Sequence, residues 1–262
     1  MFSRSSSPIQ QRSIAPLHGS QRPLFRMKAN LKYIWPALAL LFLGFSLLSG
    51  CQGGYFKGQT EEKVVALTFD DGPHPVYTPQ VLDILDRFSV RATFFLIGSQ
   101  AQAHPDQVRR IRERGHALGN HSFHHPFYLS WLSPEGIRTE ILETQEVIHR
   151  LGGEYPRYFR PPLGWVSSDL MAVCRELNLP VINGSVKASD VSRPGTERII
   201  ETVLSDVESG DIIILHDAGG VEGYRDRVQT IEALPIIIEK LKYSGYRFVF
   251  IDDLILFPQK DR

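Results

Sequence analysis

Acidic and imidazole side chains occur in this sequence at spacings that could bind a metal ion. Asp70 and Asp71 stand side by side after the apolar run VVALTF, and the run HSFHH places His121 and His125 four positions apart. On a helical turn these two histidines would share one face. One carboxylate and two imidazoles leave a coordination position open for water, which is typical of a catalytic rather than a structural zinc site.

Each of these features also has a purely structural explanation. Asp-Gly after a strand is an ordinary turn with solvated acids, and clustered histidines can simply lie on a surface. A strand-end histidine such as His216 can be a buried core residue. The position of these residues favours catalysis, because active sites of parallel barrels collect at the carboxyl ends of the strands. Polar residues follow the expected strands at that end: Asp70, Asp71, His121, Arg160 and His216.

The elements that would position these residues alternate along the chain. Apolar runs predict strands at residues 64–69, 92–97, 117–119, 158–159, 181–182, 212–215 and 248–251. Periodic or polar runs predict helices at residues 79–88, 105–114, 133–151, 168–177, 196–207 and 230–242. About seven alternations predict an α/β fold with a parallel sheet closed, or nearly closed, into a (β/α) barrel. An open doubly wound sheet is the alternative.

Composition excludes several classes of protein. Hydrophobic residues make up 42% and charged residues 22% of the 262 residues, which is ordinary for a globular protein and excludes wholesale disorder. Residues 61–262 carry 29 acidic and 22 basic residues, a net charge of −7, so no nucleic-acid partner is expected. Two cysteines, Cys51 and Cys174, cannot form a disulfide framework, and Cys174 is expected to be a packed thiol.

The first 50 residues have the layout of an export signal. Basic residues precede an uncharged run of fifteen residues, 34–48, which is shorter than the roughly 20 residues of a permanent membrane helix. The run ends at Leu48-Ser49-Gly50-Cys51, which resembles the lipobox of bacterial lipoproteins. In that family the cysteine is acylated and becomes the mature N-terminus. An uncleaved signal anchor is the alternative.

These features predict three segments. Residues 1–50 would be an N-terminal extension and lipoprotein-type signal peptide, in which either Met1 or Met27 is the start. Residues 51–62 would be a tether, and residues 63–262 the globular domain. We expect the protein to be exported and anchored through Cys51 to the extracytoplasmic side of a membrane, in the cell envelope or periplasm.

Three stretches of the globular part carry a family resemblance. TFDDGPHPVYTPQVLDIL, RATFFLIG and GHALGNHSFHHP closely resemble the polysaccharide deacetylases with a NodB homology domain, carbohydrate esterase family 4. The resemblance extends from Lys63 to Ile251. It implies a distorted (β/α) barrel and metal-dependent removal of N-acetyl groups from sugar polymers.

The resemblance also implies a role for each matched residue. Asp70 would be the general base, and Arg160, in RPPLG, would orient and tune it. His216, in ILHD, would be the general acid, with Asp190 as its partner. The implied metal ligands are Asp71, His121 and His125, and the implied substrate contacts are Leu163, through its backbone N–H, and Leu215.

The fourth motif of this chain departs from the family pattern. The family commonly has Asp-x-x-Asp-Trp, whereas this chain has Lys187-Ala188-Ser189-Asp190-Val191. Asp190 is kept, but the smaller Val191 would leave one wall of the acetyl pocket less filled, which affects substrate fit more than chemistry. His124, Trp131 and Trp165 receive no role, although an exposed tryptophan could stack on sugar rings.

The resemblance predicts an N-deacetylase that releases acetate from N-acetylglucosamine-type residues of a cell-envelope or extracellular glycan. The expected partners are that N-acetylated glycan and, through the lipid anchor, a membrane. Peptidoglycan, chitin fragments and an exopolysaccharide all present the sugar. Zn²⁺ is the expected metal, although the ligand set suits Co²⁺, Ni²⁺ and Fe²⁺ comparably. The alternatives are a carbohydrate-binding protein that lost turnover, and an O-acetyl esterase or cyclic amidase on the same scaffold.

Overall fold

The computed structural model describes residues 54–219 and 226–255, which all belong to Cys51–Arg262, the second of two units into which the chain divides. The expected signal segment and the lipidation site Cys51 lie outside the described residues. Within the described part of the chain, no helix is both long enough and apolar enough to cross a membrane.

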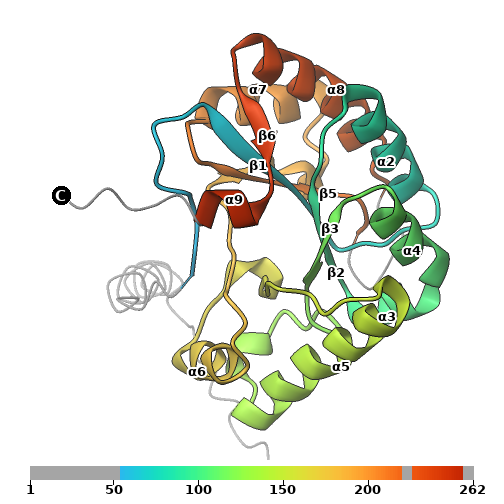
Figure 1. Cartoon of the computed structure of the whole chain (residues 1–262), viewed down its shortest axis with the longest axis vertical. Coiled ribbons are helices and arrows are strands. Elements are labelled where there is room, and N and C mark those ends of the chain that lie inside the picture. The colour runs from blue at the N-terminus through green and yellow to red at the C-terminus, as the bar shows by residue number, and fades with distance from the viewer. Residues whose placement is uncertain (1–53, 220–225, 256–262) are drawn as a thin grey trace, which may run out of the picture. The chain divides into compact units, whose positions relative to one another are not determined.

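A parallel β-sheet forms the centre of this unit (Figure 1). Its strands are β1 (Val64–Asp70), β2 (Thr93–Leu96), β3 (Ala117–Asn120), β4 (Val186–Lys187), β5 (Ile212–His216) and β6 (Arg247–Val249). The strand order is β3-β2-β1-β5-β4, and β6 pairs with the first half of β1. Strand β1 is buried along its whole length, as is typical of a central strand in a parallel sheet. The expected α/β class is therefore confirmed.

Two isolated bridges extend the sheet beyond β3. Phe159 pairs with Asn120, and Val181 pairs with Phe159. The strands expected at residues 158–159 and 181–182 are thus single bridges rather than full strands. Ile182 in turn pairs with Tyr55, and Lys57 of the same segment pairs with Asp211, directly before β5. These bridges therefore continue the pairing from β3 toward the residue that precedes β5.

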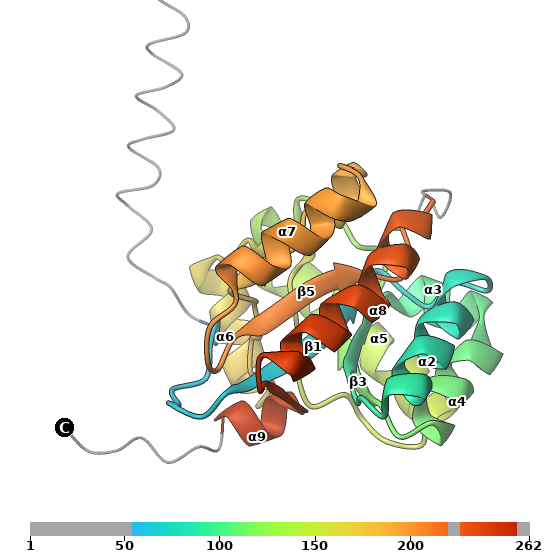
Figure 2. The same ribbon diagram turned by 90° about the horizontal axis from the view of Figure 1, so that it is seen from above.

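Helices flank the sheet, as the two views show (Figures 1 and 2). They are α2 (Tyr77–Phe88), α3 (Gly98–Ala103), α4 (Pro105–Glu113), α5 (Pro134–Gly152), α6 (Ser168–Glu176), α7 (Thr196–Asp206), α8 (Val228–Tyr243) and α9 (Ile251–Ile255). Every expected helix is present, with ends within two residues of those expected. Short 3₁₀ turns at Leu129–Trp131, Pro162–Gly164 and Asp190–Ser192 lie between them. Helices α3 and α9 were not expected, and α9 begins where the last strand was expected to end.

The alternation of side chains along β1 separates the core from the site. Val65, Leu67 and Phe69 pack into the largest hydrophobic cluster, together with apolar residues of α2, α7 and α8. Thr68 and Asp70 point to the opposite face, where both contact Arg160. Because successive strand residues point to opposite faces, the same strand provides core packing on one side and polar groups on the other.

Candidate active site

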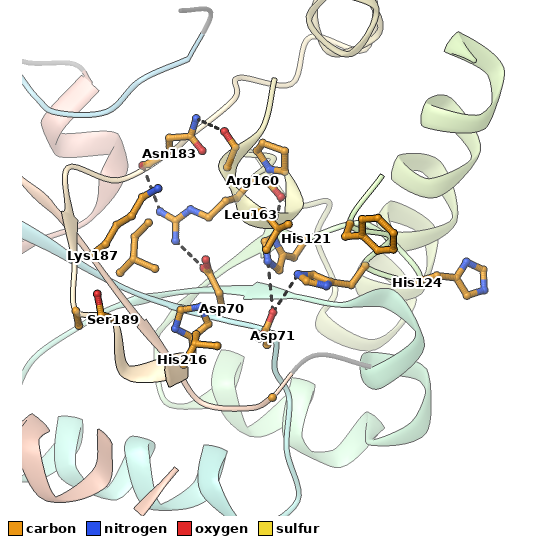
Figure 3. A pocket seen from close by; sticks show the side chains of 18 residues that line it. Asp70, Asp71, His121, His124, Arg160, Leu163, Asn183, Lys187, Ser189 and His216 are labelled. Atoms are coloured by element: carbon orange, nitrogen blue, oxygen red, sulfur yellow. Dashed lines mark hydrogen bonds and ion pairs between the residues drawn. The ribbon is translucent and has the colours of Figure 1, made fainter. Parts of the chain in front are cut away.

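The carboxyl ends of the strands border a cleft of about 600 Å³. In β1 and β5, Asp70 and His216 lie directly opposite each other, because the two strands are in register. Figure 3 shows the polar side chains converging on this cleft from several elements. The structure brings together these residues that the sequence singled out: Asp70, Asp71, His121, His125, Arg160, Leu163 and His216.

Asp70 is held by the buried guanidinium of Arg160. Arg160 Nη1 donates to Asp70 Oδ1 at 2.6 Å, and both side chains are almost fully buried. The same nitrogen also donates to Thr68 Oγ1, and Arg160 Nε donates to the carbonyl of Ile182. Among the described residues, Asp70 Oδ2 has no hydrogen-bond partner, so this oxygen is available to a water molecule in the cleft.

Asp71, His121 and His125 form a compact group of potential metal ligands. One ligand atom from each lies within 4.8 Å of the others, and Asp71 Oδ1 is 3.6 Å from His121 Nε2 and 3.3 Å from His125 Nε2. His121 Nδ1 lies 2.7 Å from the carbonyl oxygen of Arg160, which can only accept a hydrogen bond, so Nδ1 carries the proton. That tautomer leaves the lone pair of Nε2 directed at Asp71, as metal-binding histidines require.

The charge states of this group also suit a divalent cation. Burial, reinforced by the nearby His121, lowers the pKa of His125 to about 4, so its imidazole is neutral at pH 7. Burial alone would raise the pKa of Asp71, but the imidazoles of His121, His216 and His125 around it hold that pKa well below its usual range. A carboxylate and two imidazoles are a donor set that fits Zn²⁺ and related metals.

The loop that carries the two histidines is not helical, contrary to the helical turn that their spacing suggested. Residues 121–125 follow β3 as an irregular segment, with left-handed backbone at Ser122 (φ +63°) and His125 (φ +54°). Glu140 of α5 accepts hydrogen bonds from the backbone N–H groups of Phe123 and His124. The two histidines therefore meet through a folded loop that α5 supports.

His216 and Asp190 form a second acid–base pair. His216 Nδ1 lies 2.8 Å from Asp190 Oδ1, and Asp190 Oδ2 accepts from the backbone N–H of His216 and from Thr230 Oγ1. Burial would lower the pKa of His216, but the facing Asp190 carboxylate raises it to about 9, with smaller contributions from Asp71 and Asp70. His216 is thus protonated at neutral pH and can donate a proton from Nε2.

Backbone strain is concentrated around the cleft. Four of the lining residues have positive φ without being glycine: Asp71, His125, Leu163 and Ser189. Such conformations cost about 1–3 kcal/mol each and are typical of functional sites. At Leu163 (φ +59°) the side chain is exposed and the backbone follows Arg160-Pro161-Pro162 along the cleft.

One predicted substrate contact is wrong. Leu215 is fully buried in the large core cluster, on the face of β5 that packs against the helices. Its neighbour Ile214 lines the cleft instead. The motif drew attention to Leu215, the residue next to His216. Because successive side chains of a strand alternate, His216 shares a face with Ile214, two positions earlier, and Leu215 points to the opposite face.

The structure also gives the burial and contacts of the residues to which the sequence assigned no catalytic role. His124 extends away from Asp71 and pairs with Glu140, and it is 62% exposed (Figure 3). Cys174 is buried in the cluster around α6, where burial raises the pKa of its thiol to about 12, as expected for a packed cysteine. Trp131 and Trp165 contact each other at 5.5 Å between ring centroids, and both are exposed.

Sequence reasoning missed several residues that hold the site together. Thr230 contacts Asp190, and Glu140 supports the histidine loop. The buried Arg227 donates to the backbone carbonyls of Ala218 and Asp190. These residues lie far from the motifs in sequence, and a single threonine, glutamate or arginine carries no pattern by which the sequence alone could identify it.

Comparison with known proteins agrees with this geometry. The model of the polysaccharide deacetylase family matches residues 57–182. A peptidoglycan-N-acetylglucosamine deacetylase of Bacillus cereus is 39% identical over 196 residues, covering 74% of this chain and 89% of that protein. A chitooligosaccharide deacetylase of Sinorhizobium fredii is 38% identical over 190 residues, covering 70% and 87%. A crystal structure of a peptidoglycan N-acetylglucosamine deacetylase aligns with a TM-score of 0.73 at 34% identity, covering 80% of this chain and 95% of that one.

Fold, site and relatives together define a glycan deacetylase, a hydrolase that acts on carbon–nitrogen bonds other than peptide bonds. The chain belongs to the polysaccharide deacetylase family, with the NodB homology domain that its motifs predicted.

Proposed function

We propose that this protein is a metal-dependent N-deacetylase of N-acetylglucosamine-type residues in a cell-envelope or extracellular glycan. The observation that carries the proposal is that a potential metal site and a pair of acid–base groups lie in the same cleft. A compact Asp71–His121–His125 triad lies beside an Arg160-held carboxylate and a protonated His216. Amide hydrolysis needs both an electrophile at the carbonyl and a proton for the leaving amine.

The chain's own residues divide this work between them. Asp70 Oδ2, left open by the Arg160 contact, takes the proton of the attacking water. His216 donates a proton from Nε2 to the leaving nitrogen, while Asp190 holds the ring through Nδ1. The backbone N–H of Leu163 would stabilise the negative charge that develops on the carbonyl oxygen. A divalent cation held by the triad would supply Lewis acidity to the carbonyl and to the water.

An exposed aromatic cluster supports a polymeric sugar as substrate. Phe127 lines the cleft and Tyr128 contacts Phe127. The backbone N–H of Trp131 donates to the carbonyl of Tyr128, and the Trp131 ring contacts Trp165. All four side chains are exposed. Rings of this kind present flat apolar faces with little loss of conformational entropy, and they suit the apolar faces of sugar rings.

The test is acetate release by the purified protein from N-acetylated glycans before and after removal of bound metal. We expect release that stops on chelation and returns when Zn²⁺ or Co²⁺ is added back. Retention of full activity after complete metal removal would contradict the metal-dependent mechanism. Binding of the glycans without any acetate release would support the binding-protein alternative, and release from O-acetylated polymers alone would support the esterase.

We propose, on the sequence of residues 27–51, that the enzyme is exported and anchored to the extracytoplasmic side of a membrane through acylated Cys51. The lipobox-like Leu48-Ser49-Gly50-Cys51 and the short apolar run before it support this proposal. Such an anchor would place the catalytic domain next to an envelope glycan.

A further inference from the structure

Lys187 carries the one unpaired positive charge among the described residues that line the cleft. Arg160 is paired with Asp70, His216 with Asp190 and His124 with Glu140, and the two histidines of the triad face Asp71. Lys187 has no ion pair or side-chain hydrogen bond with any described residue. No described carboxylate therefore lies within 4.0 Å of its ammonium group.

The strand register directs this side chain into the cleft. Lys187 lies opposite Ile214 in the β4–β5 pair, and residues paired across parallel strands point to the same face. Ile214 lines the cleft, and so does Lys187, whereas its neighbour Val186 packs into the core. The orientation of Lys187 is thus set by the backbone.

The ammonium group lies against the loop that follows Arg160. A side chain at Gly164 would place its Cβ 3.8 Å from Lys187 Nζ and 3.3 Å from Asn183 Oδ1. Figure 3 shows Lys187 and Asn183 on the same side of Asp70. Gly164 has no side chain to cover Nζ and Lys187 is exposed, so the ammonium group is accessible to a group of the substrate in the cleft.

We propose that Lys187 selects a glycan with a carboxylate on the sugar next to the one that loses its acetyl group. This inference rests on the proposed deacetylase function and names the class of its substrate: an acidic glycan rather than a neutral one. A free ammonium beside the reacting centre attracts an anion there. With neutral N-acetylglucosamine it can only donate hydrogen bonds to hydroxyl or carbonyl oxygens, without the attraction of an opposite charge.

Charge in the rest of the domain makes this local cation more important. Residues 61–262 have a net charge of −7, so an acidic polymer is repelled by the domain as a whole. A carboxylate that binds in the cleft therefore depends on a cation within contact distance. Arg160 does not fill this role, because Asp70 already occupies its Nη1.

The experiment compares matched substrates. One is a tetrasaccharide of alternating N-acetylglucosamine and N-acetylmuramic acid without peptide. The second is its methyl ester, which is neutral, and the third is chitotetraose. Lys187→Met, which removes the charge but keeps the chain length, should lower kcat/KM for the acid about tenfold, mainly through KM, as the loss of one charge-assisted contact predicts. The ester and chitotetraose should change less than about twofold.

Additional variants and conditions make the outcome specific. Lys187→Arg should restore most of the affinity for the acid, and Lys187→Glu should reduce it further. The matched control is Lys240→Met, an exposed lysine on α8, which should leave all three substrates unchanged. Raising the ionic strength should increase KM for the acid in the wild type but not in Lys187→Met.

Several results would overturn the inference. Equal losses on the acid, its ester and chitotetraose would show that Lys187 acts on the catalytic groups instead of on the substrate's charge. No loss on any substrate would show that it acts on neither. A loss confined to a peptide-bearing tetrasaccharide, whose lactyl carboxyl is an amide, would assign the contact to a peptide carboxylate. Failure of the wild type to release acetate from every substrate would instead refute the proposed function.

Discussion

Asp70 and Asp71 share a peptide bond but face different partners. Asp70, the last residue of β1, points to Arg160, whereas Asp71 follows with a left-handed backbone (φ +74°) and points to the two histidines. The positive φ at Asp71 turns consecutive carboxylates toward different partners without the need for a longer loop. Two roles within two residues are therefore a consequence of local backbone geometry.

Replacing each of these two carboxylates separately by an amide distinguishes their proposed roles. Asp71→Asn should weaken metal binding sharply, because it removes the anionic ligand. Asp70→Asn should retain the metal and lower kcat about 10²–10⁴-fold, as expected for a lost general base. Metal stoichiometry and kcat are the measurements, with circular dichroism to verify folding. If Asp70→Asn lost the metal and Asp71→Asn kept it but lost activity, Asp70 would be the metal ligand and Asp71 the general base.

The Asp190 carboxylate determines the pH range over which His216 can donate a proton. In the wild type, activity should fall as the pH rises through about 9, where His216 loses its proton. Asp190→Asn removes the charge that raises this pKa, so the alkaline limb of the kcat profile should move to lower pH. Metal content should not change.

A matched variant tests whether charge or packing is responsible. Thr230→Val removes a hydrogen bond to Asp190 Oδ2 but keeps the carboxylate, so its alkaline limb should move less than that of Asp190→Asn. An alkaline limb that stays in place in Asp190→Asn would show that the pair does not control the pH dependence.

At the scale of elements, the longer helices and most strands were predictable from the sequence, whereas the two-residue strand β4 and the short helices α3 and α9 were not. Helix α5 illustrates why: Ser133 caps its first turn by accepting from the Gly136 N–H, Pro134 begins it, and Gly153 ends it at φ +83°. Strand β4 has only two residues, one of them a lysine, and no periodic pattern can reveal such a strand. The apolar run before residue 251 was ambiguous for a related reason, since short apolar runs fit strand and helix alike.

The site was predictable to the extent that its residues follow strands within recognisable motifs. Asp70, His121 and His216 belong to this group. The spacing of His121 and His125 suggested a helical turn, whereas the structure brings the two side chains together with Asp71 through an irregular loop. The direction of Leu215 was not predictable from its motif, because it depends on which face of β5 meets the helices.

Helix α5 supports the histidine loop through Glu140. Glu140→Ala removes the acceptor for the backbone N–H groups of Phe123 and His124 in this loop, and a typical hydrogen bond contributes about 0.5–1.5 kcal/mol. We expect a lower metal affinity, measured by competition with a chelator, and a lower Tm. Glu143→Ala, an exposed position on the same helix, is the control and should change neither.

If Glu140→Ala and Glu143→Ala bind metal equally well, the loop keeps its shape without α5. The positive φ values of Ser122 and His125 would then be sufficient to hold the ligands in place.

At the scale of the whole molecule, residues 1–62 are predicted to determine where the enzyme acts. Cys51→Ser should release or mislocalise the protein, because lipid chains contribute about 0.8 kcal/mol per buried CH₂ to membrane binding. Activity in solution should not change. The measurements are fractionation of the cells and the intact mass of membrane-extracted protein, which should show acylation and the loss of everything before Cys51. An unmodified thiol, or retention of residues from Met27 onward, contradicts the prediction.

The pairing of β1 with β5 also has a consequence for how the protein is made. Thr68 on β1 donates to the carbonyl of Ile213 on β5, 145 positions further along the chain. At about 5–20 residues per second, roughly 7 to 30 s of synthesis separate these two strands. During that interval one edge of the fully buried strand β1 is open, and open strand edges recruit other chains. Aggregation through this edge is therefore favoured until β5 emerges, and the same late strand delivers His216.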